Sequence, residues 1–225
     1  YDRDYAACTT SIQDGGLSLQ TAALWVDYVY LDTDERRRFA QMSHEYLIDQ
    51  VQFHGSEPVI FGTSSNYKFR LNFNHPVKEL VWVLQRNVNA QRGTAYNDWF
   101  NFSASNPGTP APQTAVDLMA DAKILLNGHD RFATRPQTYF RLVQPYQHHT
   151  RAPDTGINVY SFALRPEEHQ PSGTCNFSRI DNSTLQLVLT NATVEGTKTA
   201  KVRVYATNYN VLRVMSGMGG LAYSN

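Results

Sequence analysis

The chain has 225 residues and carries 20 basic and 20 acidic side chains, so its formal net charge is zero. Because binding to nucleic-acid phosphates needs an excess of basic residues, this balance argues against direct nucleic-acid binding. No apolar run approaches the roughly 20 residues that a membrane-spanning helix needs. The 13 Tyr and 11 Phe residues favour β-strands over helices. We therefore expect one β-rich domain, and two small ones remain an alternative.

Alternation of apolar and polar residues predicts eight β-strands. Between residues 67 and 73 the odd positions are Tyr, Phe, Leu and Phe, whereas the even positions are Lys, Arg and Asn. This pattern indicates a strand with one buried and one solvated face. The interior of residues 77–84 is apolar on both faces, so this strand should lie deep inside a sheet. The eight predicted strands are residues 17–31, 46–53, 67–73, 77–84, 122–126, 157–164, 184–190 and 201–215.

Helix signals are few. Residues 32–42 begin with Asp32 and Thr33, either of which can cap a helix, and acids precede bases along the segment. This order predicts a helix of about two to three turns. Residues 138–144 fit either a short helical turn or a strand. Residues 87–114 and 127–156 are predicted to be long connectors, which typically lie on the surface.

The predicted elements indicate an all-β fold. Eight strands, few short helices and long connectors fit an eight-stranded antiparallel jelly-roll sandwich. An immunoglobulin-like sandwich fits less well, because it typically needs only about 100 residues.

The sequence shows no familiar catalytic signature: it lacks G-x-S-x-G, G-x-x-x-x-G-K-[ST] and H-E-x-x-H motifs. His148 and His149 come nearest to a metal-ligand pattern. Adjacent residues of a strand point to opposite faces, however, so we interpret them as ordinary loop histidines. Cys175 has only His169 nearby in the sequence, which does not indicate a nucleophilic pair. We therefore expect no enzymatic activity, no metal and no cofactor.

Two further features concern sugars. N-x-[ST] triplets mark four candidate glycosylation sites, which are Asn101, Asn176, Asn182 and Asn191. Such triplets often arise by chance, and they matter only if the chain meets glycosylation machinery. In the first connector, Tyr96, Trp99 and Phe100 could stack on a sugar or anchor the loop to the sandwich.

Five blocks of the sequence are similar to the major capsid proteins of large icosahedral nucleocytoplasmic DNA viruses, the group of the chloroviruses and iridoviruses. The blocks occur in the family's order, and the last is closest to chlorovirus-type members. They are residues 71–83 (LNFNHPVKELVWV), 125–132 (LLNGHDRF), 144–150 (QPYQHHT), 160–180 (YSFALRPEEHQPSGTCNFSRI) and 208–225 (NYNVLRVMSGMGGLAYSN). The resemblance covers most of the chain from about residue 17 onward.

The resemblance implies a structural function. Family members fold as two jelly rolls in one chain, and three chains form a pseudo-hexagonal capsomer of the icosahedral shell. This chain has room for one jelly roll and does not begin with Met, so we expect the carboxy-terminal half of a longer polypeptide. We expect residues 1–16 to be a leading segment or inter-domain linker, residues 17–215 the jelly roll, and residues 216–225 a C-terminal tail.

The resemblance also implies partners and a location. The expected partners are copies of the same chain, as a homotrimer and in neighbouring capsomers, and penton and minor capsid proteins. The protein is expected in the virion shell, assembled in the host cytoplasm, outside an internal viral membrane that it does not span. In the proline-rich connector 165–173, Arg165, Glu167 and Glu168 are candidate contacts to another jelly roll. The alternative functions are a jelly-roll carbohydrate-binding module and, less favoured, a cupin-like metal enzyme.

Overall fold

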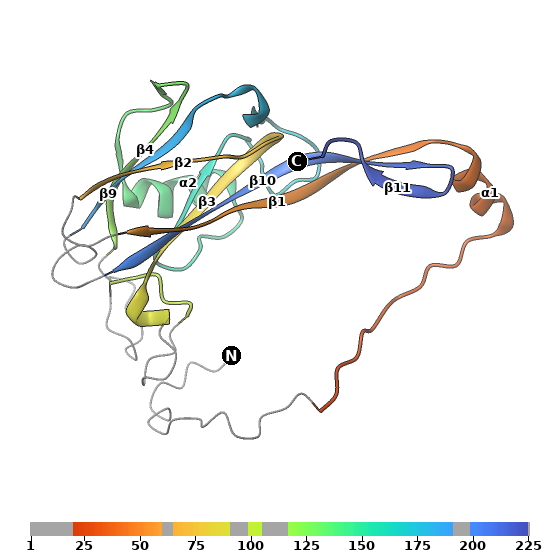
Figure 1. Ribbon diagram of the computed structural model, residues 1–225, viewed down its shortest axis with the longest axis horizontal. Coiled ribbons are helices and arrows are strands. Elements are labelled where there is room, and N and C mark those ends of the chain that lie inside the picture. Colours follow the sequence, from red (N-terminus) through yellow and green to blue (C-terminus); the bar gives the residue numbers. More distant parts are fainter. Residues whose placement is uncertain (1–19, 60–64, 91–98, 105–116, 191–198, 225) are drawn as a thin grey trace.

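A computed structural model of the chain describes residues 20–59, 65–90, 99–104, 117–190 and 199–224. Two antiparallel sheets form a sandwich, and a long ribbon projects from it (Figure 1). The strands are β1 His44–Val59, β2 Asn66–Arg70, β3 Pro76–Arg86, β4 Met119–Leu126, β5 His129–Asp130, β6 Arg135–Pro136, β7 Ile157–Ser161, β8 Cys175–Asn176, β9 Ser183–Leu189, β10 Ala200–Met215 and β11 Met218–Leu221. The helical elements are α1 Thr33–Gln41, η1 Asn87–Ala90, η2 Tyr139–Val143, α2 Gln144–His148 and η3 Phe177–Arg179.

The pairing of the strands is that of a jelly roll. One sheet has the order β1-β10-β3-β7, with β11 added to β10 and β8 to β3. The other has the order β2-β9-β4-β5, with β6 added to β4. The first long strand thus pairs with the last, β2 with β9, β3 with β7, and β4 with the short β5 and β6. This nested pairing of eight strand positions confirms the predicted all-β jelly-roll class.

The core lies between the two sheets, as the alternation predicts. In β9 every second residue is buried, including Leu185, Leu187 and Leu189, and these side chains face apolar residues of β3 and β10. Trp82 of β3 is fully buried and meets the ring of Phe140 edge-on at 5.1 Å between centroids. The prediction that residues 77–84 lie deep in a sheet is confirmed, since β3 lies between β10 and β7.

The predicted helix at residues 32–42 is confirmed as α1. Asp32 is its N-cap, and its carboxylate accepts a hydrogen bond from the Glu35 N–H at 3.0 Å. None of its residues is buried, so α1 is a solvated element at the end of the projecting ribbon (Figure 1). Of the two alternatives for residues 138–144, the helical one is right, because the π-helical turn η2 continues directly into α2.

Several predicted strand segments need correction, among them 67–73, which ends at Arg70. Residues 20–31, the described part of the predicted strand 17–31, are extended but belong to no ladder among the described residues. The predicted strand 157–164 ends at Ser161, because the next two N–H groups turn to the carbonyl of Lys78. Conversely, β1 and β4 begin earlier than predicted, at His44 and Met119.

The C-terminal residues form a strand where a simple tail was expected. Ser216 and Gly217 both have positive φ angles, of 54° and 76°, and join β10 to β11 in a two-residue hairpin. A type I′ turn needs this geometry and brings Met215 opposite Met218. The hairpin widens the free end of the ribbon that β1 and β10 form.

Candidate assembly surfaces

The connector between β6 and β7 is anchored to the sandwich by two side chains. Phe140 of η2 is fully buried against Trp82. Gln144 accepts a hydrogen bond from the Ser161 N–H at 3.0 Å and donates one to the Tyr139 hydroxyl at 2.9 Å. These contacts fix η2 and α2 against the edge strand β7, so the connector has a defined position on the surface of the sandwich.

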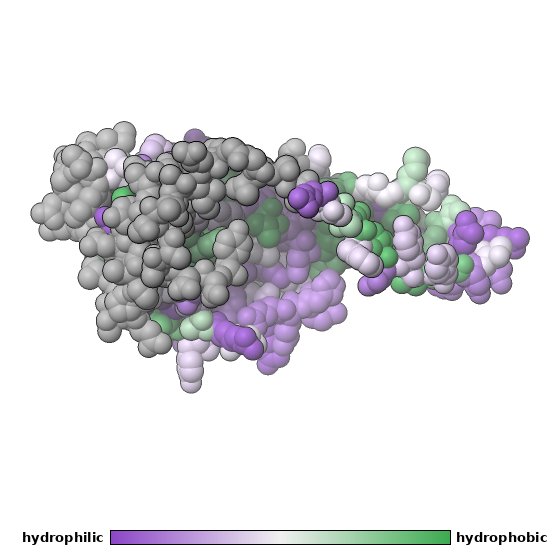
Figure 2. All heavy atoms as spheres, turned by 90° about the horizontal axis from the view of Figure 1, so that it is seen from below, coloured by the Kyte–Doolittle hydropathy of each residue, from purple (hydrophilic) through white to green (hydrophobic). Residues whose placement is uncertain are grey.

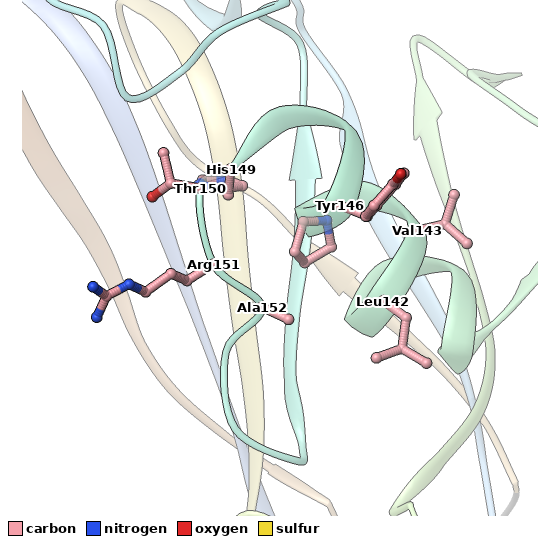
Figure 3. A pocket seen from close by; sticks show the side chains of 8 residues that line it. Leu142, Val143, Tyr146, His149, Thr150, Arg151 and Ala152 are labelled. Carbon is pink, nitrogen blue, oxygen red and sulfur yellow. The ribbon is translucent and has the colours of Figure 1, made fainter.

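An apolar hollow of about 550 Å³ lies on the outer side of this connector. Figure 3 shows Leu142, Val143 and Tyr146 on the helical side, with the loop that follows α2 opposite them. Tyr146 is 88% exposed, which is unusual for an aromatic residue on a helix packed to a sheet. The guanidinium of Arg151 extends away from the helical side. An exposed apolar hollow of this kind suits contact with another protein surface.

His149 links this connector to the sheet and to the 165–173 connector. Its Nε2 lies 3.1 Å from Oε2 of Glu79 on β3, and its Nδ1 lies 3.1 Å from Oε1 of Glu167. The Glu167 carboxylate also accepts the backbone N–H of Thr150 at 3.1 Å, and Glu79 accepts the hydroxyl of Thr207 at 3.2 Å. One imidazole thus bridges two carboxylates from distant parts of the sequence.

The charges in this cluster shift two pKa values in opposite directions. The pKa of His149 is raised, mainly by its contact with the Glu79 carboxylate. Glu167 adds to this upward shift, and burial opposes it. The backbone N–H of Thr150 is the main cause that lowers the pKa of Glu167, and His149 adds to it. Both shifts favour the charged pair, so the cluster acts as a charge-assisted clamp.

The three residues predicted to contact another jelly roll lie on the surface of the 165–173 connector. Arg165 Nη1 lies 3.2 Å from Glu168 Oε1, and both side chains are more than half exposed. Glu167 is the one of the three that bonds to another connector, through His149 and Thr150. The contact to a second jelly roll stays a prediction, since one chain is described. Gly173, with a φ of 140°, brings the connector back toward Phe162 and Ala163.

The candidate glycosylation sites differ in exposure. The side chain of Asn101 is buried, and its Oδ1 accepts hydrogen bonds from the backbone and hydroxyl of Ser103. Asn176 and Asn182 are exposed. Asn191 lies outside the described residues, as does Tyr96 of the aromatic connector, whereas Trp99 and Phe100 are described and exposed.

The two adjacent histidines diverge at the end of α2, where His148 is the last helical residue and His149 the C-cap, so the expected loop position is wrong for His148. His148 donates from Nδ1 to the carbonyl of Leu164 at 2.9 Å, while His149 faces the two glutamates. Within the described parts of the chain, no group of three or more His, Cys, Asp or Glu side chains is arranged to hold a metal ion. Burial raises the pKa of the Cys175 thiol, which disfavours the reactive thiolate. The described helices include none with the length and apolar character to cross a membrane.

The projecting ribbon is a second exposed surface. Tyr46 of β1 is exposed in this ribbon. Val51 and Phe53 are also exposed where β1 is the edge of the sandwich sheet, and Phe53 stacks there on Tyr205 of β10 at 4.8 Å between ring centroids. Figure 2 shows hydrophobic residues along the ribbon and strongly hydrophilic ones at its far end. Apolar residues on both the connector and the ribbon leave the sandwich with more than one surface fit for protein contacts.

Sequence reasoning missed Glu79, Lys78 and Asp49 as site residues. Lys78 is buried and its Nζ lies 2.9 Å from Asp49 Oδ2, across the strands of one sheet. The available signal was the Lys78-Glu79 pair inside an otherwise apolar strand, because a charge in such a strand needs a partner.

The fold is thus a jelly-roll sandwich, and its exposed connector and ribbon are surfaces suited to contacts with other proteins. The chain belongs to the family of the large eukaryotic DNA virus major capsid proteins, whose family model matches residues 35–220. It is 50% identical to the major capsid protein of Phaeocystis pouchetii virus, over 92% of this chain and 54% of the relative. It is 53% identical to that of Pyramimonas orientalis virus, over 93% of this chain and 50% of the relative. The chain therefore spans about half the length of the curated relatives it matches.

Solved structures agree with this assignment. A quasi-atomic model of the PBCV-1 virus capsid contains a chain 40% identical to this one, with a TM-score of 0.66, matched over 88% of this chain and 56% of that chain. The Faustovirus major capsid protein, only 12% identical, has a TM-score of 0.65 and shares the fold. These matches support the capsid interpretation and not the carbohydrate-binding alternative.

Proposed function

We propose that this chain is the carboxy-terminal of the two jelly rolls of a major capsid protein that builds an icosahedral virus shell without catalysis. The observation that carries the proposal is the likeness to a chain of the PBCV-1 virus capsid, at 40% identity over 88% of this chain. In this proposal the complete polypeptide holds two jelly rolls, and three copies form a pseudo-hexagonal capsomer. Its function is geometric: rigid sandwiches bury surface against one another, and stable interfaces of this kind bury above about 1,200 Å² each.

Further parts of the proposal concern the place of the protein. It assembles in the host cytoplasm and lies in the virion shell, outside an internal viral membrane. Its partners are copies of itself, penton proteins and minor capsid proteins. The exposed hollow beside Tyr146 and the ribbon of β1 and β10 are surfaces available for such contacts.

The test is the solution mass by light scattering, for the full-length protein and for this chain. A trimeric full-length protein supports the capsomer proposal, and the state of this chain then shows which half carries the principal interface. A full-length protein that stays monomeric under assembly conditions would overturn the trimer.

The connector contact is tested by the double variant Arg165→Ala/Glu168→Ala in the full-length protein. This pair is exposed, so its loss should leave the fold intact but weaken the trimer if the connector meets another jelly roll. The matched control is Lys123→Ala/Asp130→Ala, a surface pair at 3.1 Å on the other sheet. If the Arg165→Ala/Glu168→Ala variant has an unchanged trimer mass, the proposed contact of this connector with another jelly roll is wrong.

A further inference from the structure

His149, in the loop that follows α2 (Figure 3), makes two contacts that a neutral imidazole cannot satisfy together. Both ring nitrogens lie 3.1 Å from a carboxylate oxygen, Nε2 from Glu79 and Nδ1 from Glu167. An ionised carboxylate only accepts hydrogen bonds, and a neutral imidazole has a single N–H to donate. The geometry of the clamp therefore requires the protonated ring, which carries a proton on each nitrogen.

The two carboxylates of the clamp differ in their access to water. The side chain of Glu79 is 15% exposed, and its Oε2 is a buried atom that no hydrogen bond satisfies among the described residues, so the charge of His149 compensates it. The side chain of Glu167 is 41% exposed. A buried carboxylate oxygen without a donor is costly, whereas an exposed one can turn to water. A neutral ring should therefore keep its one proton on Nε2, toward Glu79, and direct the lone pair of Nδ1 at Glu167.

The remaining charged and titratable side chains near the clamp have other partners or face solvent. Arg151, in the same loop, is exposed. The partnered groups are Arg165 with Glu168 at 3.2 Å, Lys78 with Asp49 at 2.9 Å, and His148 with the carbonyl of Leu164 at 2.9 Å. The protonation of His149 is thus governed by the two carboxylates that contact it, one from β3 and one from the 165–173 connector.

We propose that the clamp is a proton-operated latch, which is closed while His149 is protonated and opens on the Glu167 side when the ring loses its Nδ1 proton. Opening releases the 165–173 connector from the loop after α2, whereas the loop stays fastened to β3 through Glu79. The sandwich keeps its fold in both states. Because the connector carries Arg165 and Glu168, the latch sets the position of an exposed charged surface. A single chain contains the whole latch, so the proposal is independent of the proposed trimer.

The direction of the switch follows from the charges of the closed state. The pKa of His149 is raised above 6.5 and that of Glu167 is lowered below 4.5, so between these values the ring is positive and the carboxylate negative. This is the range in which the latch is closed. As the pH rises through the raised pKa of His149, the ring becomes neutral and the contact with Glu167 is lost. The connector is therefore held at mildly acidic pH and released at alkaline pH.

The test is hydrogen exchange of backbone amides in the full-length protein at about pH 6 and about pH 9, on either side of the ordinary range of a histidine. Each exchange rate is compared with that of an unstructured peptide of the same sequence at the same pH. The amide of Thr150 is the reporter, because it donates to the Glu167 carboxylate at 3.1 Å. Its protection should fall about 10-fold at the higher pH, while amides of β3 and β10 stay protected. Equal protection of Thr150 at both pH values would overturn the proposal, and so would a parallel loss in β3 and β10.

The variant Glu167→Gln should hold the latch closed at both pH values. With the amide nitrogen in the place of Oε1, Gln donates to the neutral Nδ1 of His149, and its oxygen in the place of Oε2 still accepts the Thr150 N–H. The protection of Thr150 should therefore no longer depend on pH. A Glu167→Gln protein that opens at about pH 9 as the parent does would overturn the proposal.

The variant His149→Gln should leave the latch open at both pH values, because its side chain carries no positive charge. The protection of Thr150 should then be as weak at about pH 6 as it is in the parent protein at about pH 9. The matched control is His169→Gln, an exposed histidine of the same connector, which should keep the pH dependence of the parent. A pH dependence that survives in His149→Gln would assign the switch to another group and overturn the proposal.

Discussion

His149 and Glu167 tie together two connectors that lie 18 residues apart in the sequence, through a contact of 3.1 Å between Nδ1 and Oε1. The other ring nitrogen of His149 faces Glu79 on β3, also at 3.1 Å. The surface loop after α2 and the 165–173 connector are thus fastened to the central strand of one sheet. If either connector contacts a neighbouring subunit, this clamp sets the position in which it does so.

The first prediction concerns the pH dependence of this clamp. The pKa of His149 is raised above its ordinary value of 6.5, so the stability from its protonated form is complete below about pH 6.5 and is lost as pH rises through the raised pKa. The pKa of Glu167 is lowered below 4.5, so its contribution is present above that pH and is lost as pH falls through the lowered value. The clamp should therefore stabilise most between these two limits, as urea unfolding at several pH values would show.

His149→Gln should lower the free energy of unfolding near pH 6 by about 1–3 kcal/mol, a range typical of a buried hydrogen-bonding group that loses its partner. In this variant the free energy of unfolding should also fall less steeply as the pH rises through the raised pKa of His149. His129→Gln is the control, because His129 is exposed on β5 and should leave the profile unchanged. An alkaline decline that persists unchanged in His149→Gln would assign it to another group.

Much of the fold was predictable because its strands have one buried face. The alternation in β2, β9 and β10 located those strands, and Asp32 with its following acids located α1. β5 and β6 have two residues each, which is too short for any periodic signal, so the sequence could not reveal them. Residues 20–31 carry a strand-like pattern but join no ladder among the described residues, so the pattern alone did not locate a strand there.

The site was less predictable, because its contacts join distant residues. Nothing in the sequence links Glu79 to His149, or Asp49 to Lys78, since sheet register and connector packing bring each pair together. The turns were different: Asn127-Gly128 and Ser216-Gly217 both carry positive φ angles, and such dipeptides are recognisable hairpin signals.

A second prediction concerns Gly156, at the turn before β7. Its φ is 90°, and a Cβ at this position would lie 2.3 Å from the carbonyl oxygen of Phe102. Gly156→Ala therefore adds a backbone clash to the cost of the left-handed conformation, and should destabilise by about 2–4 kcal/mol. Gly128→Ala is the control, because its φ is 83° but no atom lies within 4 Å of the added Cβ. It should cost only about 1 kcal/mol. Equal losses in thermal unfolding would show that the contact with Phe102 does not matter.

A third prediction uses the difference in burial among the N-x-[ST] sites. If the chain is produced where it meets N-glycosylation machinery, Asn176 and Asn182 can carry glycans on the folded surface, whereas Asn101 should remain unmodified. Asn101 is only 7% exposed and its Oδ1 accepts hydrogen bonds from Ser103, so the folded protein leaves no room for a glycan on Nδ2. Peptide mapping by mass spectrometry checks this, and a glycan on Asn101 of the folded protein would contradict the observed burial.

The last prediction is an asymmetry between Lys78 and Asp49. The side chain of Lys78 is 6% exposed and that of Asp49 37%, and the Lys78 ammonium also lies 5.2 Å from the centre of the Tyr209 ring. Asp49→Ala leaves a buried cation beside the face of the Tyr209 ring without its carboxylate partner, which should cost about 2–4 kcal/mol. Lys78→Met leaves a carboxylate that water can still reach, so it should cost about 1 kcal/mol or less.

Urea unfolding of both single variants and of Asp49→Ala/Lys78→Met measures this asymmetry. The double variant should be more stable than Asp49→Ala alone, because it removes the stranded charge. Lys123→Met, which breaks the more exposed pair with Asp130, should cost under about 1 kcal/mol and serves as the control. Equal losses of unfolding free energy in Asp49→Ala and Lys78→Met would contradict this prediction. They would mean that the Lys78 ammonium finds another partner and that its ion pair with Asp49 does not stabilise the contact between β1 and β3 across β10.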